Sequence, residues 1–230
     1  MQYQLISFDL DGTLVDTAAE IAEAVNRALD DHGIRRRPLP EITELIGAGT
    51  RELMVRLLAQ RVAEAPWLEE VSRRDRVLQS LDRHYAWTAG TSAVPYAGCR
   101  QALEQLRVAG VRLVCVTNKE YAHARRVLRA TRLSDCFELL IGGDTLPARK
   151  PDPIVMQHVL QRFDVPPERA AHLGDSAIDV ATARTAGIAA WAVPYGYNGG
   201  VPVAESRPDL MFEELMQVAT HVLAHVGNGT

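Results

Sequence analysis

Short apolar runs of strand length alternate with amphipathic, helix-like segments along most of this 230-residue chain. Such alternation is typical of a parallel sheet with helices on both faces, because parallel strands are buried on both sides and are joined by helical crossovers. We therefore predict an α/β fold built on a doubly wound parallel sheet. The runs expected to form its buried strands are Leu5–Leu10, Val111–Val116, Glu138–Ile141, Ala170–Leu173 and Ile188–Val193.

The alternation stops between Asp16 and about Val94, where apolar residues recur at helical spacing throughout. A chain of this length has room for a core domain and a smaller second domain. We predict that residues 1–15 and 95–230 form the sheet domain and that residues 16–94 form a helical insertion. Small polar residues at the two boundaries are expected to act as hinges.

Polar residues able to carry chemistry follow the expected strands, at the end of the sheet where ligands bind in such folds. The first run ends in Asp9 and Asp11, which lie on one side of an extended chain, and Gly12 then permits a sharp turn. Later strand ends carry Thr117, Asn118 and Lys119, then Lys150 before Pro151, and lastly Asp175 and Asp179 at the start of a helical segment.

The four aspartates would crowd together if these strand ends converge. Two like charges 4 Å apart repel by about 4 kcal/mol at an effective dielectric of 20, so the group needs cations. A divalent metal and a lysine would supply them, and an all-oxygen ligand set suits Mg²⁺. Taken singly, Asp175 or Asp179 is explained equally well as a helix-capping residue.

Lysine usage in the chain is unusual. Of its 25 basic residues 23 are arginine, and Lys119 and Lys150 are the only lysines. This suggests that lysine is kept where a compact ammonium on a flexible stem is needed. For Lys119, an exposed loop position is an equally good interpretation.

Composition argues against several classes of protein. The net charge of −4, without a clustered basic face, disfavours nucleic-acid binding. No apolar run is long enough for a membrane span, and the N-terminus lacks the pattern of a secretion signal. Three cysteines without a C-x-x-C pair suit free thiols in a reducing compartment. We expect a cytoplasmic protein, monomeric or homodimeric.

Four segments of the sequence together resemble the motifs of the haloacid dehalogenase superfamily, in the right order. They are Phe8-Asp9-Leu10-Asp11-Gly12-Thr13-Leu14, the strand end at Thr117, Lys150-Pro151, and Gly174-Asp175-Ser176 followed by Asp179. The resemblance implies a Rossmann-like core with a mobile helical cap inserted after the first motif. The block of helical pattern that begins at Asp16 stands at that place.

The resemblance also implies roles for the catalytic residues. Asp9 would be the nucleophile that forms an aspartyl phosphate, and Asp11 would protonate the leaving oxygen and then activate water. Thr117 would hydrogen-bond the transferring phosphoryl group. Lys150 would neutralise charge on the nucleophile and the phosphate, and Asn118 and Lys119 are weaker candidates for contact with the substrate.

The metal ligands follow from the same resemblance. Asp175 would bind Mg²⁺ together with Asp9 and the backbone carbonyl of Asp11. Asp179 would be a metal ligand or would orient a metal-bound water.

The acid at position 11 favours a phosphatase, because the dehalogenases of this superfamily lack it and a halide leaving group needs no proton. The whole-chain pattern is most similar to the phosphoglycolate phosphatases. We therefore predict a Mg²⁺-dependent phosphomonoester hydrolase acting on a small anionic metabolite, with 2-phosphoglycolate as the leading candidate. The alternative is a sugar-phosphate phosphatase or a β-phosphoglucomutase-like phosphotransferase of the same superfamily.

Two other classes fit the sequence poorly. A signalling receiver domain is about half this length and has no acids after its lysine, whereas Asp175 and Asp179 follow Lys150 here. A dinucleotide-binding fold would need G-x-G-x-x-G, and the Gly47-Ala48-Gly49 segment lacks the third glycine and follows a helical pattern.

In the helical insertion, Arg51 is the candidate for substrate recognition. It follows a flexible glycine turn at the start of a helical segment. It could grip the non-transferring anion of the substrate in a bidentate fork, or it could be a solvated arginine at a helix start.

Overall fold

The computed structural model describes residues 3–62 and 66–224. Within this part of the chain, six parallel strands form one sheet in the order β5-β4-β1-β6-β7-β8. The α/β fold with a doubly wound parallel sheet is therefore confirmed. The strands are β1 (Leu5–Phe8), β4 (Arg112–Val116), β5 (Leu139–Ile141), β6 (Ala170–Gly174), β7 (Ala189–Ala192) and β8 (Leu210–Met211).

Helices cover both faces of the sheet because its strands are apolar on both sides. On β4, Leu113 and Cys115 join one hydrophobic cluster, while Val114 and Val116 join another. The first cluster is closed by α5 (Cys99–Val108), α6 (Tyr121–Ala130) and α9 (Leu215–Ala224), and the second by α7 (Pro153–Phe163) and α8 (Ala177–Thr185). Short 3₁₀ turns cover Ser134–Cys136, Pro167–Arg169 and Val203–Ser206.

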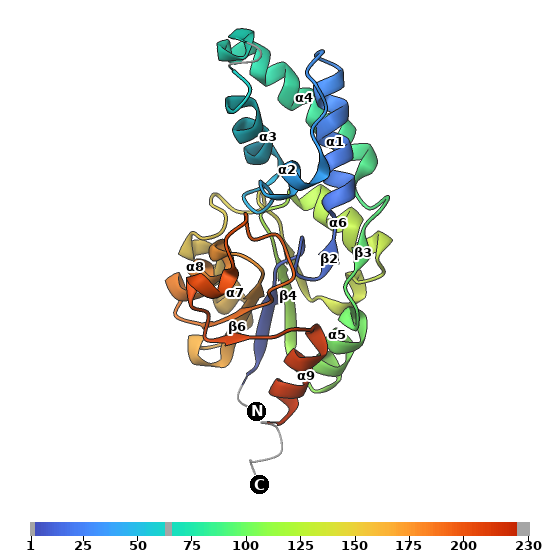
Figure 1. Cartoon of the computed structure of the whole chain (residues 1–230). Helices are drawn as coiled ribbons and strands as arrows, with labels where there is room; N and C mark the ends of the chain where they lie inside the picture. The colour runs from blue at the N-terminus through green and yellow to red at the C-terminus, as the bar shows by residue number, and fades with distance from the viewer. Residues whose placement is uncertain (1–2, 63–65, 225–230) are drawn as a thin grey trace.

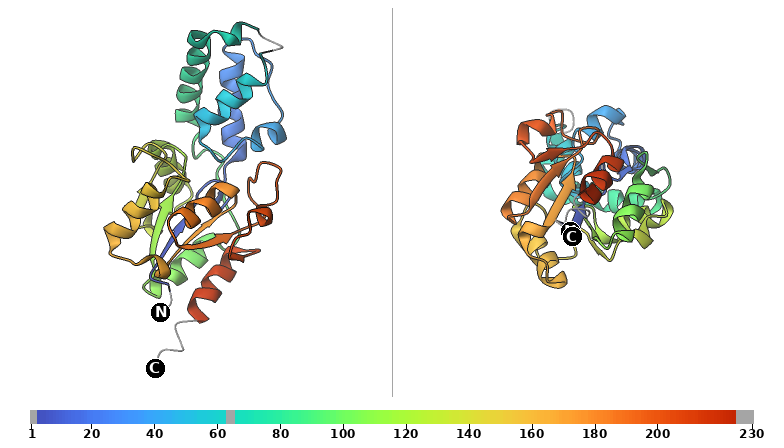
Figure 2. Two further views of the ribbon diagram at one scale, coloured as in Figure 1. Left: turned by 90° about the vertical axis from the view of Figure 1, so that its left-hand side faces the viewer. Right: turned by 90° about the horizontal axis from the view of Figure 1, so that it is seen from below.

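A separate bundle of helices stands at the carboxyl ends of the strands (Figures 1 and 2). Its own hydrophobic cluster draws on residues 21–89 alone and includes Leu29, Leu57 and Tyr85. The bundle therefore has a core independent of the sheet. Its members are α1 (Ala18–Asp30), α2 (Leu39–Thr43), α3 (Thr50–Ala59), the 3₁₀ turn Pro66–Glu69 and α4 (Val71–Thr88).

The two chain segments that join the bundle to the sheet domain lie side by side. They form a short antiparallel ribbon of β2 (Val15–Asp16) and β3 (Val94–Pro95). The hydroxyl of Tyr197, from the loop after β7, accepts hydrogen bonds from the backbone N–H groups of Thr17 and Ala18 at 2.8 and 2.9 Å. The segments expected to be hinges are thus paired with each other, and the start of α1 is tied to the sheet domain.

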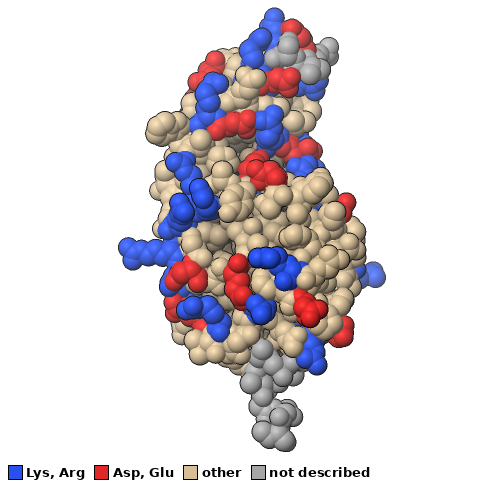
Figure 3. Space-filling view, turned by 180° about the vertical axis from the view of Figure 1, so that it is seen from behind, with Lys and Arg blue, Asp and Glu red and all other residues tan. Residues whose placement is uncertain are grey.

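Charged side chains are spread over the surface. On the face drawn in Figure 3, basic and acidic residues are interspersed over both the bundle and the sheet domain. Among the described residues, no helix combines the length and the apolar character that crossing a bilayer requires.

Candidate active site

The site lies where three neighbouring strands end. Strand β1 pairs with β4 on one side and β6 on the other, so the residues that follow them, Asp9, Thr117 and Asp175, meet at one edge. Gly12 allows the close approach: its φ is +83°, and a Cβ there would lie 2.2 Å from Asp175 Oδ2. The motif therefore needs glycine at position 12 for both its backbone conformation and its space.

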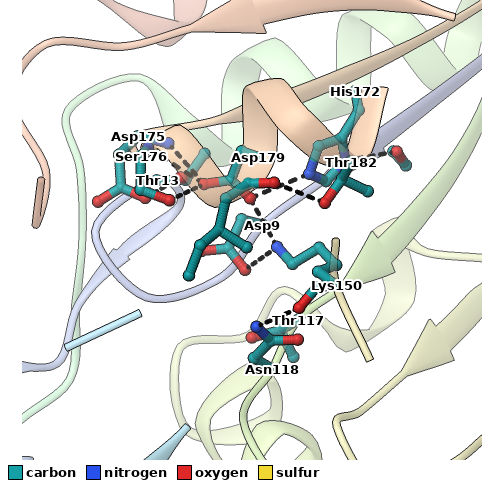
Figure 4. A network of polar contacts seen from close by, with 12 residues as sticks. Asp9, Thr13, Thr117, Asn118, Lys150, His172, Asp175, Ser176, Asp179 and Thr182 are labelled. Carbon is teal, nitrogen blue, oxygen red and sulfur yellow. Dashed lines mark hydrogen bonds and ion pairs between the residues drawn. The ribbon is translucent and has the colours of Figure 1, made fainter. Parts of the chain in front are cut away.

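Lys150 connects two of the aspartates. Its buried ammonium donates hydrogen bonds of 2.7 Å to both Asp9 Oδ1 and Asp179 Oδ1 (Figure 4). Burial alone would lower the pKa of Lys150, but the two carboxylates raise it above its ordinary value. The lysine therefore stays charged and neutralises part of the negative charge in the site.

Asp179 is held by protein donors on both carboxylate oxygens. Oδ1 accepts from Lys150 Nζ at 2.7 Å and from His172 Nε2 at 3.1 Å. Oδ2 accepts from the backbone N–H groups of Asp175 and Ser176 and from the hydroxyl of Ser176. Burial acts to raise the pKa of Asp179, but Lys150 and His172 outweigh it and hold the pKa below its usual value.

Asp9, Asp175 and Asp179 form a buried group that could hold a metal ion, with one oxygen of each within 4.8 Å of the others. Asp175 accepts hydrogen bonds from Thr13 Oγ1 at 3.2 Å and from the backbone N–H of Tyr197. Burial raises the pKa of Asp9 to about 6 and that of Asp175 well above its ordinary value. The protein's own donors therefore do not offset the effect of burial on these two carboxylates, as expected for ligands of a cation.

Two polar residues lie beneath this group, inside the sheet. Ser7 on β1 is the strand partner of His172 on β6, and Ser7 Oγ lies 2.6 Å from His172 Nδ1. Burial lowers the pKa of His172 and favours the neutral ring. A neutral ring protonated on Nε2 satisfies both contacts, since Nε2–H donates to Asp179 and Nδ1 accepts from the serine hydroxyl.

Asp11 makes its hydrogen bonds with residues outside the metal group. Its Oδ1 accepts from Thr17 Oγ1 at 2.6 Å and from Lys119 Nζ at 2.7 Å. Lys119 is buried, and its Nζ lies 5.0 Å from the ring centroid of Tyr85 on α4. Asp11 thus stands at the contact between the sheet domain and the helical bundle.

A small cavity of about 20 Å³ lies at this contact. The sheet domain lines it with Asp9, Asp11, Thr117 and Lys119, and the bundle lines it with Ile21, Ile46, Gly47, Gly49, Thr50 and Leu53. A cavity of this size has room for about one water.

Residues 3–187 match the family model of the haloacid dehalogenase-like hydrolases. The match extends from before β1 to just beyond α8 and so includes every aspartate and lysine described above. The chain belongs to this family.

Relatives of this hydrolase are named phosphoglycolate phosphatases. One from Nitrosospira multiformis is 38% identical over 212 residues, which is 92% of each chain. A plasmid-encoded one from Cupriavidus necator is 42% identical over 200 residues, covering 86% of this chain and 84% of its own. The crystal structure of a predicted phosphoglycolate phosphatase from Haemophilus somnus superposes with a TM-score of 0.92 at 29% identity, covering 96% of this chain and 99% of that one. The expectation of a phosphatase is confirmed at the level of family and enzyme class.

The site residues named from the hydrolase's sequence fall into two groups. The structure brings Asp9, Asp175, Asp179 and Lys150 into direct contact or metal-binding range, and it lines the cavity with Asp9, Asp11 and Thr117. Asn118 lies beside them, and its amide nitrogen donates to the backbone carbonyls of Gly47 and Lys150.

Arg51 is placed differently. Its half-exposed guanidinium pairs with Asp82, and it is not among the described residues that line the cavity. Thr50 lines the cavity instead, and its hydroxyl donates to the carboxylate of Glu120. Arg51 thus lies at the half-exposed start of α3 and outside the cavity lining, and its role in substrate recognition stays a prediction.

Sequence reasoning missed Ser7, His172, Thr13 and Thr50. The sequence did mark Ser7 and His172, because each is a polar residue within an apolar run that forms a strand buried on both sides of the sheet. A buried polar side chain needs a partner, so two such residues on expected neighbouring strands could have been paired. Thr13 and Thr50 carry no comparable signal.

Proposed function

We propose that this hydrolase is a Mg²⁺-dependent phosphomonoesterase that works through an aspartyl phosphate, with 2-phosphoglycolate as its substrate. The observation that carries the proposal is the pair Asp9 and Asp11 at the closed cavity, one carboxylate beside Lys150 and the other beside the helical bundle. Relatives at 38% and 42% identity over most of the chain are named for this substrate.

The donor set fits a hard divalent cation. Asp9 and Asp175 are buried carboxylates with raised pKa values, whereas Lys150 and His172 hold the pKa of Asp179 below its usual value. We assign Asp9, Asp175 and the backbone carbonyl of Asp11 as the ligands, and Asp179 as the residue that orients Lys150 and the loop at Asp175. When bound, the cation supplies charge stabilisation for the phosphoryl oxygens.

In the first half-reaction an oxygen of Asp9 forms a bond to phosphorus as the bond to the leaving alcohol oxygen breaks. Asp11 gives its proton to that oxygen. In the second, a water oxygen attacks the phosphorus, Asp11 takes the proton, and inorganic phosphate leaves as the Asp9 carboxylate reforms. Lys150 offsets the charge on Asp9 and on the phosphoryl group, and Thr117 donates a hydrogen bond to it.

The helical bundle, residues 16–94, is proposed to be a cap domain that opens for substrate entry. Its own hydrophobic core allows it to move as a unit, and the closed cavity is too small for any phosphate ester. Once closed over the substrate, the cap excludes bulk water from the reacting phosphoryl group.

The test is a phosphatase screen over a panel of phosphorylated metabolites with Mg²⁺, ranked by kcat/KM. We expect 2-phosphoglycolate to rank first and Asp9→Asn to lower turnover by at least ~10³-fold, because the covalent route is lost. Mass spectrometry of quenched wild-type turnover should find phosphate on the peptide that contains Asp9. Near-normal turnover in Asp9→Asn would exclude the mechanism, and a preference for hexose phosphates would favour the sugar-phosphate alternative.

A further inference from the structure

The walls of the closed cavity differ in charge. From the bundle come Ile21, Ile46, Leu53, Thr50 and two glycines, none of which is charged. From the sheet domain come two aspartates, a threonine and Lys119. Among the described residues that line the cavity, Lys119 is therefore the one cation, because Lys150 lies behind Asp9 and Arg51 is turned outward to Asp82.

The position of Lys119 is fixed from several sides. Its side chain is 1% exposed, and its Nζ donates to Asp11 and lies over the ring of Tyr85. Glu20 on α1 is a further buried anion close enough for Lys119 to oppose the effect of burial on its pKa. The ammonium is thus held at the boundary between the core and the bundle, with one of its three N–H donors used in the described contacts.

We propose that Lys119 determines substrate specificity by pairing with a carboxylate on the alcohol part of the phosphate ester. The inference rests on the proposed function and deepens it. The phosphoryl group must reach Asp9, so the rest of the substrate faces Lys119 and the apolar residues of the bundle. An unpaired carboxylate buried against Ile21, Ile46 and Leu53 would be strongly disfavoured, and the ammonium removes that penalty.

The shared lining of the cavity adds a limit on the substrate. Asp9 and Lys119 line the same cavity, so the phosphoryl group and the carboxylate that these residues contact must lie close together in one molecule. The class of substrate is therefore a compact phosphomonoester with a carboxylate one or two carbons from the ester oxygen. A phosphate ester of a neutral alcohol of the same length would fill the same space but would offer the ammonium no carboxylate.

The experiment compares 2-phosphoglycolate with ethyl phosphate, in which a methyl group replaces the carboxylate. Lys119→Met keeps most of the length of the side chain and removes its charge. We expect its kcat/KM to fall about 10²-fold further for 2-phosphoglycolate than for ethyl phosphate, on the scale of one charged hydrogen bond. Lys119→Arg should recover part of the difference, and the matched control Arg51→Met should show no selective loss.

Equal losses on the two substrates in Lys119→Met would overturn the inference and show that Lys119 acts through Asp11 or the phosphoryl group. Wild-type enzyme that hydrolyses phosphate esters without preferring those with a carboxylate would overturn the inference while leaving a phosphatase. Wild-type enzyme that hydrolyses neither ester would overturn the proposed function as well.

A second measurement needs no variant and so does not depend on the folding of Lys119→Met. The phosphonate 3-phosphonopropionate is isosteric with 2-phosphoglycolate, and propylphosphonate is its partner without the carboxylate. We expect the first to inhibit the wild-type enzyme at least ~10-fold more strongly than the second, for the same charged contact. Equal inhibition by the two compounds would contradict the inference.

Discussion

At the scale of single residues, the site is organised around Lys150 and Asp179 as much as around Asp9. Asp179 accepts hydrogen bonds from Lys150, His172, Ser176 and the backbone of Asp175, and a Cβ on Gly174 would lie 2.0 Å from its carboxylate carbon. Lys150 in turn fixes Asp9. The position of Asp9 thus depends on a chain of contacts that begins inside the sheet at Ser7 and His172.

His172 is therefore expected to be a positioning residue. His172→Phe removes the donor to Asp179, and we expect kcat to fall about 10- to 100-fold, the usual scale for residues behind a metal ligand or its partner. His172→Gln keeps an N–H group at similar reach and should retain most of the activity. The measurement is kcat at saturating substrate and Mg²⁺, with melting temperatures to show that both variants are folded.

The Gln variant is the control for packing. If His172→Phe and His172→Gln lose activity equally, the hydrogen bond to Asp179 has no role in catalysis. Ser7→Ala should have a smaller effect than His172→Phe, because the ring keeps its donor to Asp179 and loses only the partner of Nδ1.

At this scale, the sequence predicts the position of a residue when the strand before it fixes that position. Asp9, Thr117 and Asp175 stand at the ends of apolar strands, and the strands alone bring them together. The direction of Arg51 depends on the rotation of α3 about its axis, which is set by packing within the bundle. Sequence periodicity does not determine that rotation, so it does not predict which way a residue in the first turn of the helix points.

At the scale of elements, the buried strands were predictable and the short ones were not. All five apolar runs became strands of the sheet, each within one or two residues of the expected bounds. Strand β8 has only two residues, both exposed, and the ribbon of β2 and β3 is equally short. Such elements exist through pairing with distant segments, so they leave no local pattern.

The contact of Tyr197 likewise leaves no local pattern in the sequence, since it ties the start of α1 to the sheet domain across 180 residues. In Tyr197→Phe the backbone N–H of Thr17 loses its acceptor inside the protein. We expect the free energy of unfolding to fall by about 1–3 kcal/mol, the cost of an unsatisfied buried donor. Urea denaturation of the metal-free wild type and variant measures this difference in the free energy of unfolding.

Tyr195→Phe is the matched control, because within the described part of the chain that hydroxyl makes one hydrogen bond, to the carbonyl of Thr13. Its loss should be smaller, about 0.5–1.5 kcal/mol. A Tyr197→Phe protein as stable as the wild type would show that the tie does not hold α1 in place.

At the scale of the whole molecule, stability and metal binding are linked through the buried aspartates. The pKa of Asp9 is raised to about 6, so between about pH 4 and 6 the folded protein keeps a proton that the unfolded chain releases. Stability from this group is present at low pH and is lost as the pH rises through 6. Asp175, with its raised pKa, acts in the same direction, whereas the contribution of Asp179, with a lowered pKa, is lost only at more acidic pH.

We therefore expect the free energy of unfolding in EDTA to fall between pH 4 and 7, with about 3 kcal/mol of the fall due to Asp9. The difference between wild type and Asp9→Asn over this range isolates that part. Mg²⁺ at a hundredfold excess over its Kd should stabilise the protein by about 2.7 kcal/mol, and by less as the pH falls and the ligands take up protons. Asp175→Asn should show no stabilisation by Mg²⁺.

Two results would contradict this link between protonation and the cation. One is a pH profile in EDTA that is the same for wild type and Asp9→Asn. The other is a melting temperature that does not respond to Mg²⁺ at neutral pH.

Both lysines of the chain are buried at the site, with 2% and 4% of their surfaces exposed, and arginine supplies every other basic side chain. Reagents that acylate lysine ε-amines therefore meet no such group on the outside of the closed protein. Under the proposed cap opening, labelling at Lys119, which lies over Tyr85 of the bundle, would report that opening without the background that surface lysines give in most proteins. The rate of that labelling, with and without a bound phosphonate, reports how often the active site is open to solvent.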